Sequence, residues 1–195
     1  MKPINFLLVG VGGQGTIMAS NILAEVGLAL GYDVKKAEVH GMSQRGGSVT
    51  SHVRWADQVF SPIFPDGEAD VILAFEKMEA GRFITSLRSN GLAVINDYAI
   101  VPISVHTGEI SYPNDENLHK MVERITERAY WVDGLKIAEE LGNPRVANVV
   151  LLGALASLLD VEQEKWPAVI DRLVPAKARE INLQAFARGS ACCSS

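Results

Sequence analysis

Ile4-Asn5-Phe6-Leu7-Leu8-Val9-Gly10-Val11-Gly12-Gly13-Gln14-Gly15 is the stretch that decides the fold. Its apolar first half is typical of a buried parallel strand, and a segment with helical periodicity follows from Gly15 to Leu30. Gly10 permits a tight turn, Gly12 lets backbone approach a ligand, and Gly15 lets a helix pack closely on a strand. The N-terminal N–H groups of such a helix favour anions, above all phosphates.

The spacing of these glycines satisfies G-x-G-x-x-G, the dinucleotide fingerprint, but the pattern alone leaves alternatives open. One is a tight strand-to-helix turn that binds nothing. Another is an NAD(P)-dependent oxidoreductase in which Gly10–Gly15 holds the pyrophosphate and Glu38 binds a ribose hydroxyl. Lys35 and Lys36 accompany that glutamate, and no catalytic Lys/Tyr or His/Asp arrangement is evident, which weighs against this alternative.

A second glycine-rich segment, His40-Gly41-Met42-Ser43-Gln44-Arg45-Gly46-Gly47-Ser48, lies between two strand-like runs. Because Gly46 and Gly47 have no side chains, the main chain there is open to close approach. The planar guanidinium of Arg45 can donate paired hydrogen bonds to a carboxylate or phosphate. Further hydrogen-bonding groups come from Ser43, Gln44 and Ser48. We therefore predict that the two segments form two walls of one site. The alternative is a flexible loop whose arginine is merely solvated.

Strand-like and helix-like runs alternate along the rest of the chain. The strand-like runs are Ile4–Val9, Val34–Val39, Ser48–Trp55, Val71–Phe75, Leu92–Ile95 and Ala129–Val132. The helix-like runs are Gly15–Leu30, Lys77–Ser89, Asn117–Arg128, Gly134–Leu141, Val146–Leu159, Glu164–Arg172 and a last helix after Pro175. This alternation predicts an α/β fold with three layers and a largely parallel, Rossmann-like sheet.

The run Ser48–Trp55 differs from the others because polar and apolar residues alternate along it, which suits an antiparallel strand or one at an interface. No linker or repeat interrupts the chain, so residues 1–188 are predicted to form a single domain. Residues 189–195 are mostly small, and we expect them to form a disordered tail, to which we assign no function.

Composition narrows the function classes. The 195 residues carry a net charge of −5, which argues against nucleic acid or an anionic membrane as a partner. No signal peptide is evident, and the apolar stretch Val146–Val161 is too short to span a bilayer. The two cysteines, Cys192 and Cys193, are adjacent and make no disulfide framework, so we expect a cytoplasmic protein.

Two long motifs carry a family resemblance. Gly10-Val-Gly-Gly-Gln-Gly15, together with Glu38-Val-His-Gly-Met-Ser-Gln-Arg-Gly-Gly-Ser-Val49 and Ser51-His-Val-Arg54, resembles the beta subunit of indolepyruvate:ferredoxin oxidoreductases. That subunit is similar to the gamma subunit or domain of 2-oxoacid:ferredoxin oxidoreductases in general. Asn148-Val-Val-Leu-Leu-Gly-Ala-Leu-Ala156 resembles a late helix of the same family. The resemblance runs from about Phe6 to Phe186.

The resemblance implies oxidative decarboxylation of an aryl-pyruvate to an acyl-CoA with reduction of ferredoxin. That chemistry needs thiamine diphosphate, Mg²⁺ and iron–sulfur clusters. Two tail cysteines cannot ligate a cluster, and no Gly-Asp-Gly with a downstream Asn pair is present to hold magnesium diphosphate. We therefore expect these cofactors in a larger partner subunit, ferredoxin to react with the complex, and the isolated chain to be inactive.

For this chain the resemblance implies a share in a cleft for coenzyme A or substrate. The candidate binding residues are Gly12, Gly13, Gln14, Gly15, Ser43, Arg45, Gly46, Gly47 and Ser48. No catalytic residue is assigned. An alternative is that both glycine segments are contacts to the partner subunit, because bare backbone also permits close docking. A non-catalytic assembly or ligand-binding protein is a further alternative.

Histidine and asparagine add little to the site. His40, His52, His106 and His119 lack metal-ligand spacing, so no metal site is predicted. His40 is either a proton carrier near the site or, as we prefer, a hydrogen-bonded residue at a strand end. Asn148 either lines the cleft or forms a hydrogen bond where its helix begins.

Overall fold

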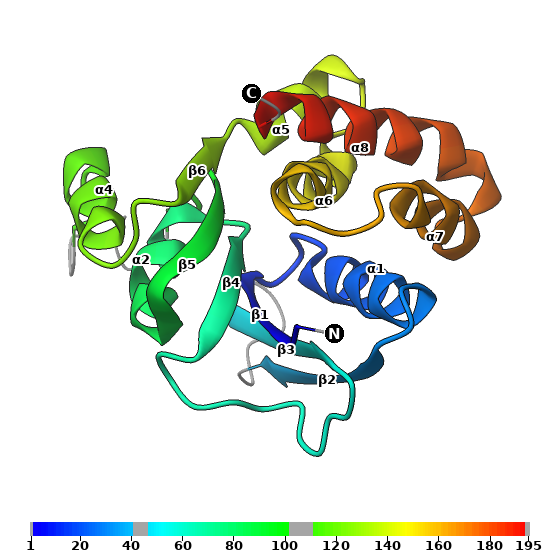
Figure 1. Cartoon of the computed structure of the whole chain (residues 1–195). Helices are drawn as coiled ribbons and strands as arrows, with labels where there is room; N and C mark the ends of the chain where they lie inside the picture. Colours follow the sequence, from blue (N-terminus) through cyan, green and yellow to red (C-terminus); the bar gives the residue numbers. More distant parts are fainter. Residues whose placement is uncertain (1, 41–46, 102–110, 194–195) are drawn as a thin grey trace.

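The computed structural model describes residues 2–40, 47–101 and 111–193, and a six-stranded sheet in the order β2-β3-β1-β4-β5-β6 runs through it (Figure 1). The strands are β1 (Ile4–Val11), β2 (Asp33–His40), β3 (Ser48–Ala56), β4 (Ala69–Ala74), β5 (Leu87–Asn96) and β6 (Ala129–Val132). β1, β4, β5 and β6 are parallel, whereas β3 runs antiparallel to both β1 and β2. The predicted α/β class is confirmed, and the Ser48–Trp55 run is an antiparallel strand.

Helices cover both faces of this sheet. They are α1 (Thr16–Ala29), α2 (Lys77–Phe83), α4 (Asp115–Glu123), α5 (Gly134–Glu140), α6 (Ala147–Leu158), α7 (Lys165–Leu173) and α8 (Arg179–Cys193). Because strand residues alternate between faces, Phe6 and Leu8 of β1 pack with α1, α6 and α7, while Leu7 and Val9 pack with α2 and α4. Figure 1 shows these two helical layers on opposite sides of the sheet.

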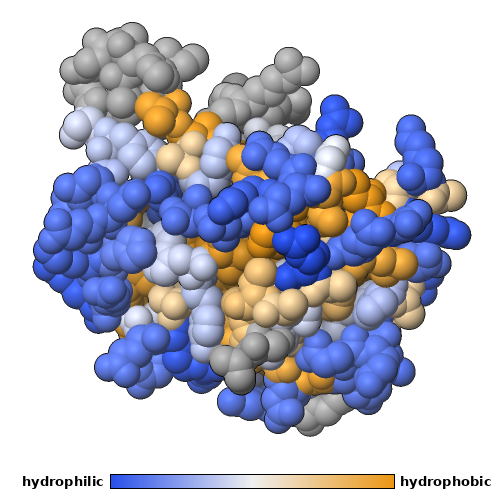
Figure 2. All heavy atoms as spheres, turned by 90° about the horizontal axis from the view of Figure 1, so that it is seen from above, coloured by the Kyte–Doolittle hydropathy of each residue, from blue (hydrophilic) through white to orange (hydrophobic). Residues whose placement is uncertain are grey.

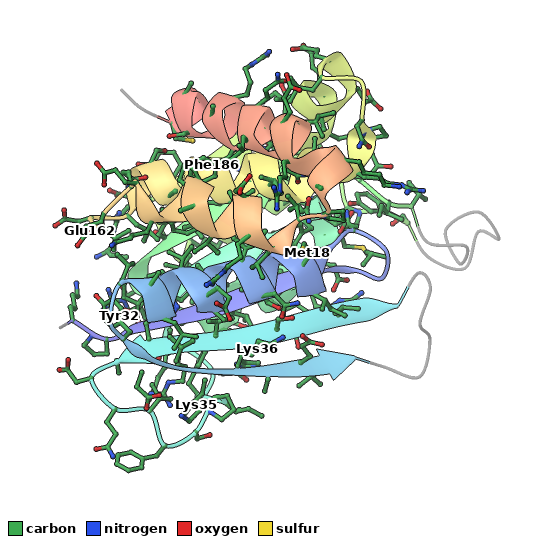
Figure 3. All side chains as sticks on the ribbon, turned by 90° about the vertical axis from the view of Figure 1, so that its right-hand side faces the viewer. Met18, Tyr32, Lys35, Lys36, Glu162 and Phe186 are labelled. Atoms are coloured by element: carbon green, nitrogen blue, oxygen red, sulfur yellow. The ribbon has the colours of Figure 1, made fainter. Side chains whose placement is uncertain are left out.

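Edge strand β2 has only β3 as a neighbour in the described sheet. Figure 3 shows Lys35 and Lys36 on opposite faces of this strand, as expected for consecutive residues of an extended chain. Trp55 of β3 is fully buried on the α1 side, with its ring centroid 4.6 Å from that of Phe6. Val49, Val53 and Trp55 therefore lie on the α1 face of β3 together with the buried Ser51, whereas Ser48, Thr50, His52 and Arg54 lie on the other face.

Helix α8 lies beyond α6 and α7, away from the sheet (Figures 1 and 3). A side-chain carbon at Gly189 would lie 1.9 Å from the carbonyl oxygen of Val150, and one at Gly153 would lie 2.1 Å from that of Phe186. Without side chains at these glycines the α6 and α8 backbones touch directly. Figure 2 views the molecule from the α8 side, where hydrophilic residues cover much of the surface between apolar areas.

The prediction of a disordered tail from Gly189 is wrong for residues 189–193, which belong to α8. Small residues indicated a flexible tail, but here they permit close helix packing, and Gly189 is buried. Ser194 and Ser195 lie outside the described residues.

Two element boundaries also differ from the predictions. The predicted helix Lys77–Ser89 ends at Phe83, followed by a 3₁₀ turn to Ser86, and β5 begins at Leu87. β5 continues through Asn90, whose φ is 59°, and its register with β4 shifts near this point. The predicted helix 117–128 begins at Asp115 because the Asn114 side chain accepts a hydrogen bond from the N–H of Asn117. No helix in the described part of the chain is long and apolar enough to cross a membrane.

Candidate functional site

The candidate site lies where the parallel strands β1, β4 and β5 end. The chain leaves β1 for α1 on one face of the sheet, and it leaves β4 for α2 on the other face. A crevice opens at the carboxyl ends of adjacent strands when their helices diverge in this way, and ligands of α/β proteins bind in such crevices. The predicted glycine turn is therefore at the position where this fold accommodates ligands.

The glycine turn has the backbone that its sequence requires. Gly13 has a φ of 104°, and Gly15 has a φ of 81° and precedes α1 without a side-chain cap. Among the described residues, no neighbouring atom lies within 4 Å of the position that a Cβ of Gly13 would take, so that part of the chain leaves the space beside it open. At Gly15 the same position lies 2.6 Å from Nδ2 of Asn148, so this glycine lets α6 approach the turn.

Gln14 braces the turn from within. Its Oε1 accepts a hydrogen bond from the N–H of Val11 at 2.7 Å, and its Nε2 donates to the carbonyl of Phe75 at 2.8 Å. The side-chain amide therefore ties the turn to the end of β4. Gln14 lines the cleft with its amide already engaged, so we assign it a shaping role.

The cleft beside the turn has a volume of about 690 Å³, within the range of small-molecule sites. Its residues come from the glycine turn, the ends of β4 and β5, and the beginnings of α5 and α6. They are Gly12, Gly13, Gln14, Gly15, Phe75, Asn96, Tyr98, Ile100, Leu135, Pro144, Arg145, Ala147, Asn148 and Leu151. Most of the surface that lines the cleft is apolar, and its polar groups lie mainly beside the glycine turn.

Two asparagines stabilise the walls of this cleft. Asn96 donates to the carbonyl of Phe75 at 3.1 Å and accepts from the N–H of Gly134 at 3.0 Å, joining β4, β5 and α5. Asn148 donates to the carbonyl of Gly15 at 3.2 Å, and its Oδ1 accepts from the N–H of Val149 at 3.0 Å. Both alternatives for Asn148 therefore hold, since it lines the cleft and forms a hydrogen bond where α6 begins.

Two groups of the site have no protein partner among the described residues. The hydroxyl of Thr16, at the first turn of α1, is buried and makes no hydrogen bond there. Arg145 lies exposed on the cleft wall and forms no ion pair within that part of the chain. A buried hydroxyl without a partner is costly, and a guanidinium binds carboxylates and phosphates in a fixed geometry. Arg145 is therefore suited to an anionic ligand, whereas the Thr16 hydroxyl is buried and does not line the cleft.

The second glycine segment meets the first. The N–H of Gly12 donates to the carbonyl of Gly47 at 2.9 Å, so the two segments are neighbours. The Ser48 hydroxyl donates to the carboxylate of Glu79 on α2. Predicted site residues Ser43, Arg45 and Gly46 lie outside the described residues, so their part in the site stays a prediction.

Sequence reasoning missed two buried carboxylates beside the site, Glu76 and Glu79. Burial raises the pKa of Glu79, while the Ser48 hydroxyl and the Arg82 guanidinium partly offset that rise. The sequence signal was present: both acids come just after the buried strand β4, where side chains reach the crevice. Thr16 and Arg145 were also missed, because neither belongs to a glycine motif.

The described histidines stay outside the cleft lining. His52 lies on β3 with its ring 4.7 Å from that of Phe64, and burial lowers the pKa of His52. His119 stacks on Trp131 with ring centroids 4.0 Å apart. Within the described residues no group of three or more His, Cys, Asp or Glu side chains could hold a metal ion. His106 and the side chain of His40 lie outside them.

Comparisons with known proteins show which family the chain resembles. The family model described as pyruvate ferredoxin/flavodoxin oxidoreductase matches residues 5–192. The chain is 42% identical over 192 residues to the indolepyruvate oxidoreductase subunit IorB of Pyrococcus horikoshii, and the match covers 97% of this chain and 95% of that subunit.

Two solved structures share the fold. One is the gamma subunit of a keto/oxoacid ferredoxin oxidoreductase from Geobacter sulfurreducens, with a TM-score of 0.72 at 22% identity over 97% of this chain and 98% of that one. The other is a 2-oxoglutarate:ferredoxin oxidoreductase from Magnetococcus marinus, solved with 2-oxoglutarate, coenzyme A and succinyl-CoA bound. Its TM-score is 0.74 at 21% identity over 99% of this chain and 31% of that one.

Proposed function

The chain belongs to the pyruvate ferredoxin/flavodoxin oxidoreductase family, and we propose that it is the small subunit of an indolepyruvate-type 2-oxoacid:ferredoxin oxidoreductase. The complex would convert an aryl-pyruvate, CoA and oxidised ferredoxin to an aryl-acetyl-CoA, carbon dioxide and reduced ferredoxin. The name of the Pyrococcus relative and the Glu38-Val-His-Gly-Met segment support the aryl-pyruvate substrate. A cytoplasmic location remains part of the proposal.

The open cleft beside the glycine turn carries the proposed role in CoA binding. CoA combines phosphates with a long pantetheine arm, so its site needs an anion-binding end and a less polar wall. The N–H groups of the first turn of α1, which has no side-chain cap, and Arg145 supply the anion-binding end. The less polar wall includes Ile100, Leu135 and Leu151. In this proposal the chain binds and orients CoA for the partner subunit.

The cofactors of the reaction do not fit this chain's own donors. Cys192 and Cys193 are its two cysteines, and both lie in the last turn of α8, with Cys192 exposed. Two thiols on one helix end cannot replace the four ligands of a typical cluster. We therefore assign the iron–sulfur clusters, thiamine diphosphate and Mg²⁺ to a larger partner subunit, and we derive no step through them here.

Strand order weighs against the dinucleotide alternative. In the dinucleotide fold the acidic residue that binds the ribose stands on the strand next to β1. Here β3 lies between β1 and β2, so Glu38 is one strand too far from the glycine turn. Its carboxylate also forms an ion pair with Lys36 at 2.6 Å. Partner docking through the glycine segments remains the alternative role, and the experiment below separates it from CoA binding.

The test uses this chain co-purified anaerobically with its partner subunit. We expect indolepyruvate- and CoA-dependent reduction of a viologen dye by the complex, and none by the chain alone. Arg145→Gln should raise the KM for CoA about tenfold, or about 1.4 kcal/mol, with the complex intact. Arg172→Gln is the control, because Arg172 pairs with Glu25 on the surface between α1 and α7.

Three results would contradict the proposal. If Arg145→Gln prevents assembly while Arg172→Gln does not, this part of the cleft docks the partner. If both variants leave the KM for CoA unchanged, Arg145 does not bind CoA. Tight NADH binding by a partnerless chain would support the dehydrogenase alternative.

A further inference from the structure

We propose that Glu76 and Glu79, at the start of α2, are positioning residues that hold two walls beside the cleft. One wall is residues 98–100, of which Tyr98 and Ile100 line the cleft, and the other is Gly47–Ser48, which does not line it but contacts Gly12 of its glycine turn. The proposal rests on the proposed function, since it concerns the geometry of the CoA cleft. The two acids are the buried carboxylates of the described chain, at 0% and 2% exposure. Neither lines the cleft, so they act through the residues that they hold.

Glu76 holds the wall formed by residues 98–100. Its Oε2 accepts from the N–H of Glu79 at 2.8 Å, which caps α2. Its Oε1 accepts from the N–H of Ile100 at 3.1 Å and from the hydroxyl of Tyr112. Tyr98 and Ile100 both line the cleft, and the carbonyl of Tyr98 accepts from the N–H of Lys77 at 3.0 Å. This wall is therefore fastened to the first residues of α2.

Glu79 holds the wall formed by Gly47 and Ser48. Its Oε2 accepts from the Ser48 hydroxyl, and its Oε1 pairs with Nη1 of Arg82 at 3.1 Å. The carbonyl of Gly47 accepts from the N–H of Gly12. The Gly47–Ser48 segment is thus held between the first glycine turn on one side and α2 on the other. Releasing Ser48 from Glu79 would detach the segment from α2 and leave it held by the turn and by the pairing of β3 in the sheet.

The chemistry of these contacts explains why acids occupy the two positions. A carboxylate has two oxygens that accept several hydrogen bonds, so a single Glu76 side chain can collect donors from two distant parts of the chain. Burial and the Glu76 carboxylate raise the pKa of Tyr112, so its hydroxyl keeps its proton and remains a donor. An apolar side chain at either position could fill the space but could hold neither wall.

The test combines kinetics of the complex with hydrogen exchange of the chain. Tyr112→Phe removes one donor to Glu76, and Glu79→Met removes the acceptor of Ser48. Glu79→Gln keeps an acceptor oxygen and serves as the conservative rescue. Ser86→Ala is the matched control, because Ser86 is also a buried hydroxyl that donates to a carboxylate, at 2.8 Å to Asp66, away from the cleft lining.

Each variant should loosen only its own wall. We expect Tyr112→Phe to speed exchange of the Ile100 amide about tenfold, and Glu79→Met to speed exchange in residues 47–49, with Glu79→Gln close to wild type. In the complex, Tyr112→Phe and Glu79→Met should each raise the KM for CoA three- to tenfold, with a smaller change in kcat. Ser86→Ala should change none of these quantities.

The inference is overturned if Tyr112→Phe behaves like Ser86→Ala in hydrogen exchange, or if every variant speeds exchange across both walls alike. It is also overturned if hydrogen exchange shows the walls loosening as expected while the KM for CoA stays unchanged in a complex whose activity saturates with CoA. Should Glu79→Met fail to fold, Tyr112→Phe and Glu79→Gln still decide. A wild-type complex without saturable CoA dependence would contradict the proposed function instead, and exchange would then decide whether the two acids hold the walls.

Discussion

The glycines of two regions differ in what lies beside them. The regions are the α6–α8 helix pair and the turn beside the cleft. In the helix pair, a side-chain carbon at Gly153 would lie 2.1 Å from the carbonyl oxygen of Phe186, so protein fills the space that the missing side chain leaves. In the turn, the same position at Gly13 has no atom of the described residues within 4 Å. The first region uses glycine for packing, whereas the second leaves open space at the edge of a cleft.

The difference separates two roles that a sequence motif cannot distinguish. A glycine whose neighbouring space is filled by protein contributes to stability, and its replacement should destabilise the fold. A glycine with open space in a cleft is available to a ligand, and its replacement should affect binding more than folding. Gly15 stands between these cases, because Asn148 of the protein itself occupies the space beside it.

The largest expected effect is a loss of stability on substitution of a glycine in the α6–α8 helix pair. Gly153→Ala would force a methyl group against the backbone of α8, so we expect a loss of about 3 kcal/mol in the free energy of unfolding, measured by urea denaturation. Gly67→Ala is the control, since a Cβ there meets no atom within 4 Å and adds only the cost of its φ of 81°. Equal losses for the two variants would show that α6 and α8 can separate without penalty.

The next largest expected effect is on the KM for CoA, when Gly13 of the turn beside the cleft is replaced. Gly13 and Gly67 both have positive φ and open space, at 104° and 81°, so alanine should cost each of them about 1 kcal/mol of stability. In the complex with the partner subunit, Gly13→Ala should raise the KM for CoA about tenfold, while Gly67→Ala leaves it unchanged. If the two variants have the same KM, the open space at Gly13 does not receive CoA, and the comparison of the two regions fails.

The local parts of both regions could be predicted from the sequence. The apolar run Ile4–Val9 and the glycines after it are contiguous, so strand, turn and helix follow from short-range pattern. The alternation along Ser48–Trp55 likewise indicated a strand with unlike faces, either antiparallel or at an interface. These predictions needed no knowledge of which segments are neighbours in space.

The remaining features depend on pairs far apart in the chain. Gly189 looked like part of a flexible tail because its partner, Val150, lies on another helix. The role of Glu76 was missed because its donor Tyr112 comes 36 residues later in the chain. The position of β3 between β1 and β2 likewise follows from strand pairing and not from any single segment. Periodicity reports which face of an element is buried, but not which element covers that face.

The smallest expected effect concerns charge and belongs to the cleft region alone. The buried carboxylates of the described chain, Glu76 and Glu79, both lie beside the cleft, and none lies between α6 and α8. Burial is the main cause that raises the pKa of Glu79 above its ordinary value of 4.5, and the Glu76 carboxylate adds to it. The folded chain therefore binds this proton more tightly than the unfolded chain does.

The sign of the pH dependence follows from this raised pKa. As pH rises from about 4.5 through the folded-state pKa of Glu79, the wild type should lose stability relative to Glu79→Gln, and the difference should be constant on either side of that interval. Urea denaturation at a series of pH values measures it. Gly67→Ala changes no titrating group, so its curve should run parallel to that of the wild type. A wild type that instead gains stability over this interval would mean that the contacts of Glu79 with Ser48 and Arg82 outweigh the effect of its burial. The charged acid of the cleft region would then stabilise the fold, as the packed glycines of the helix pair do.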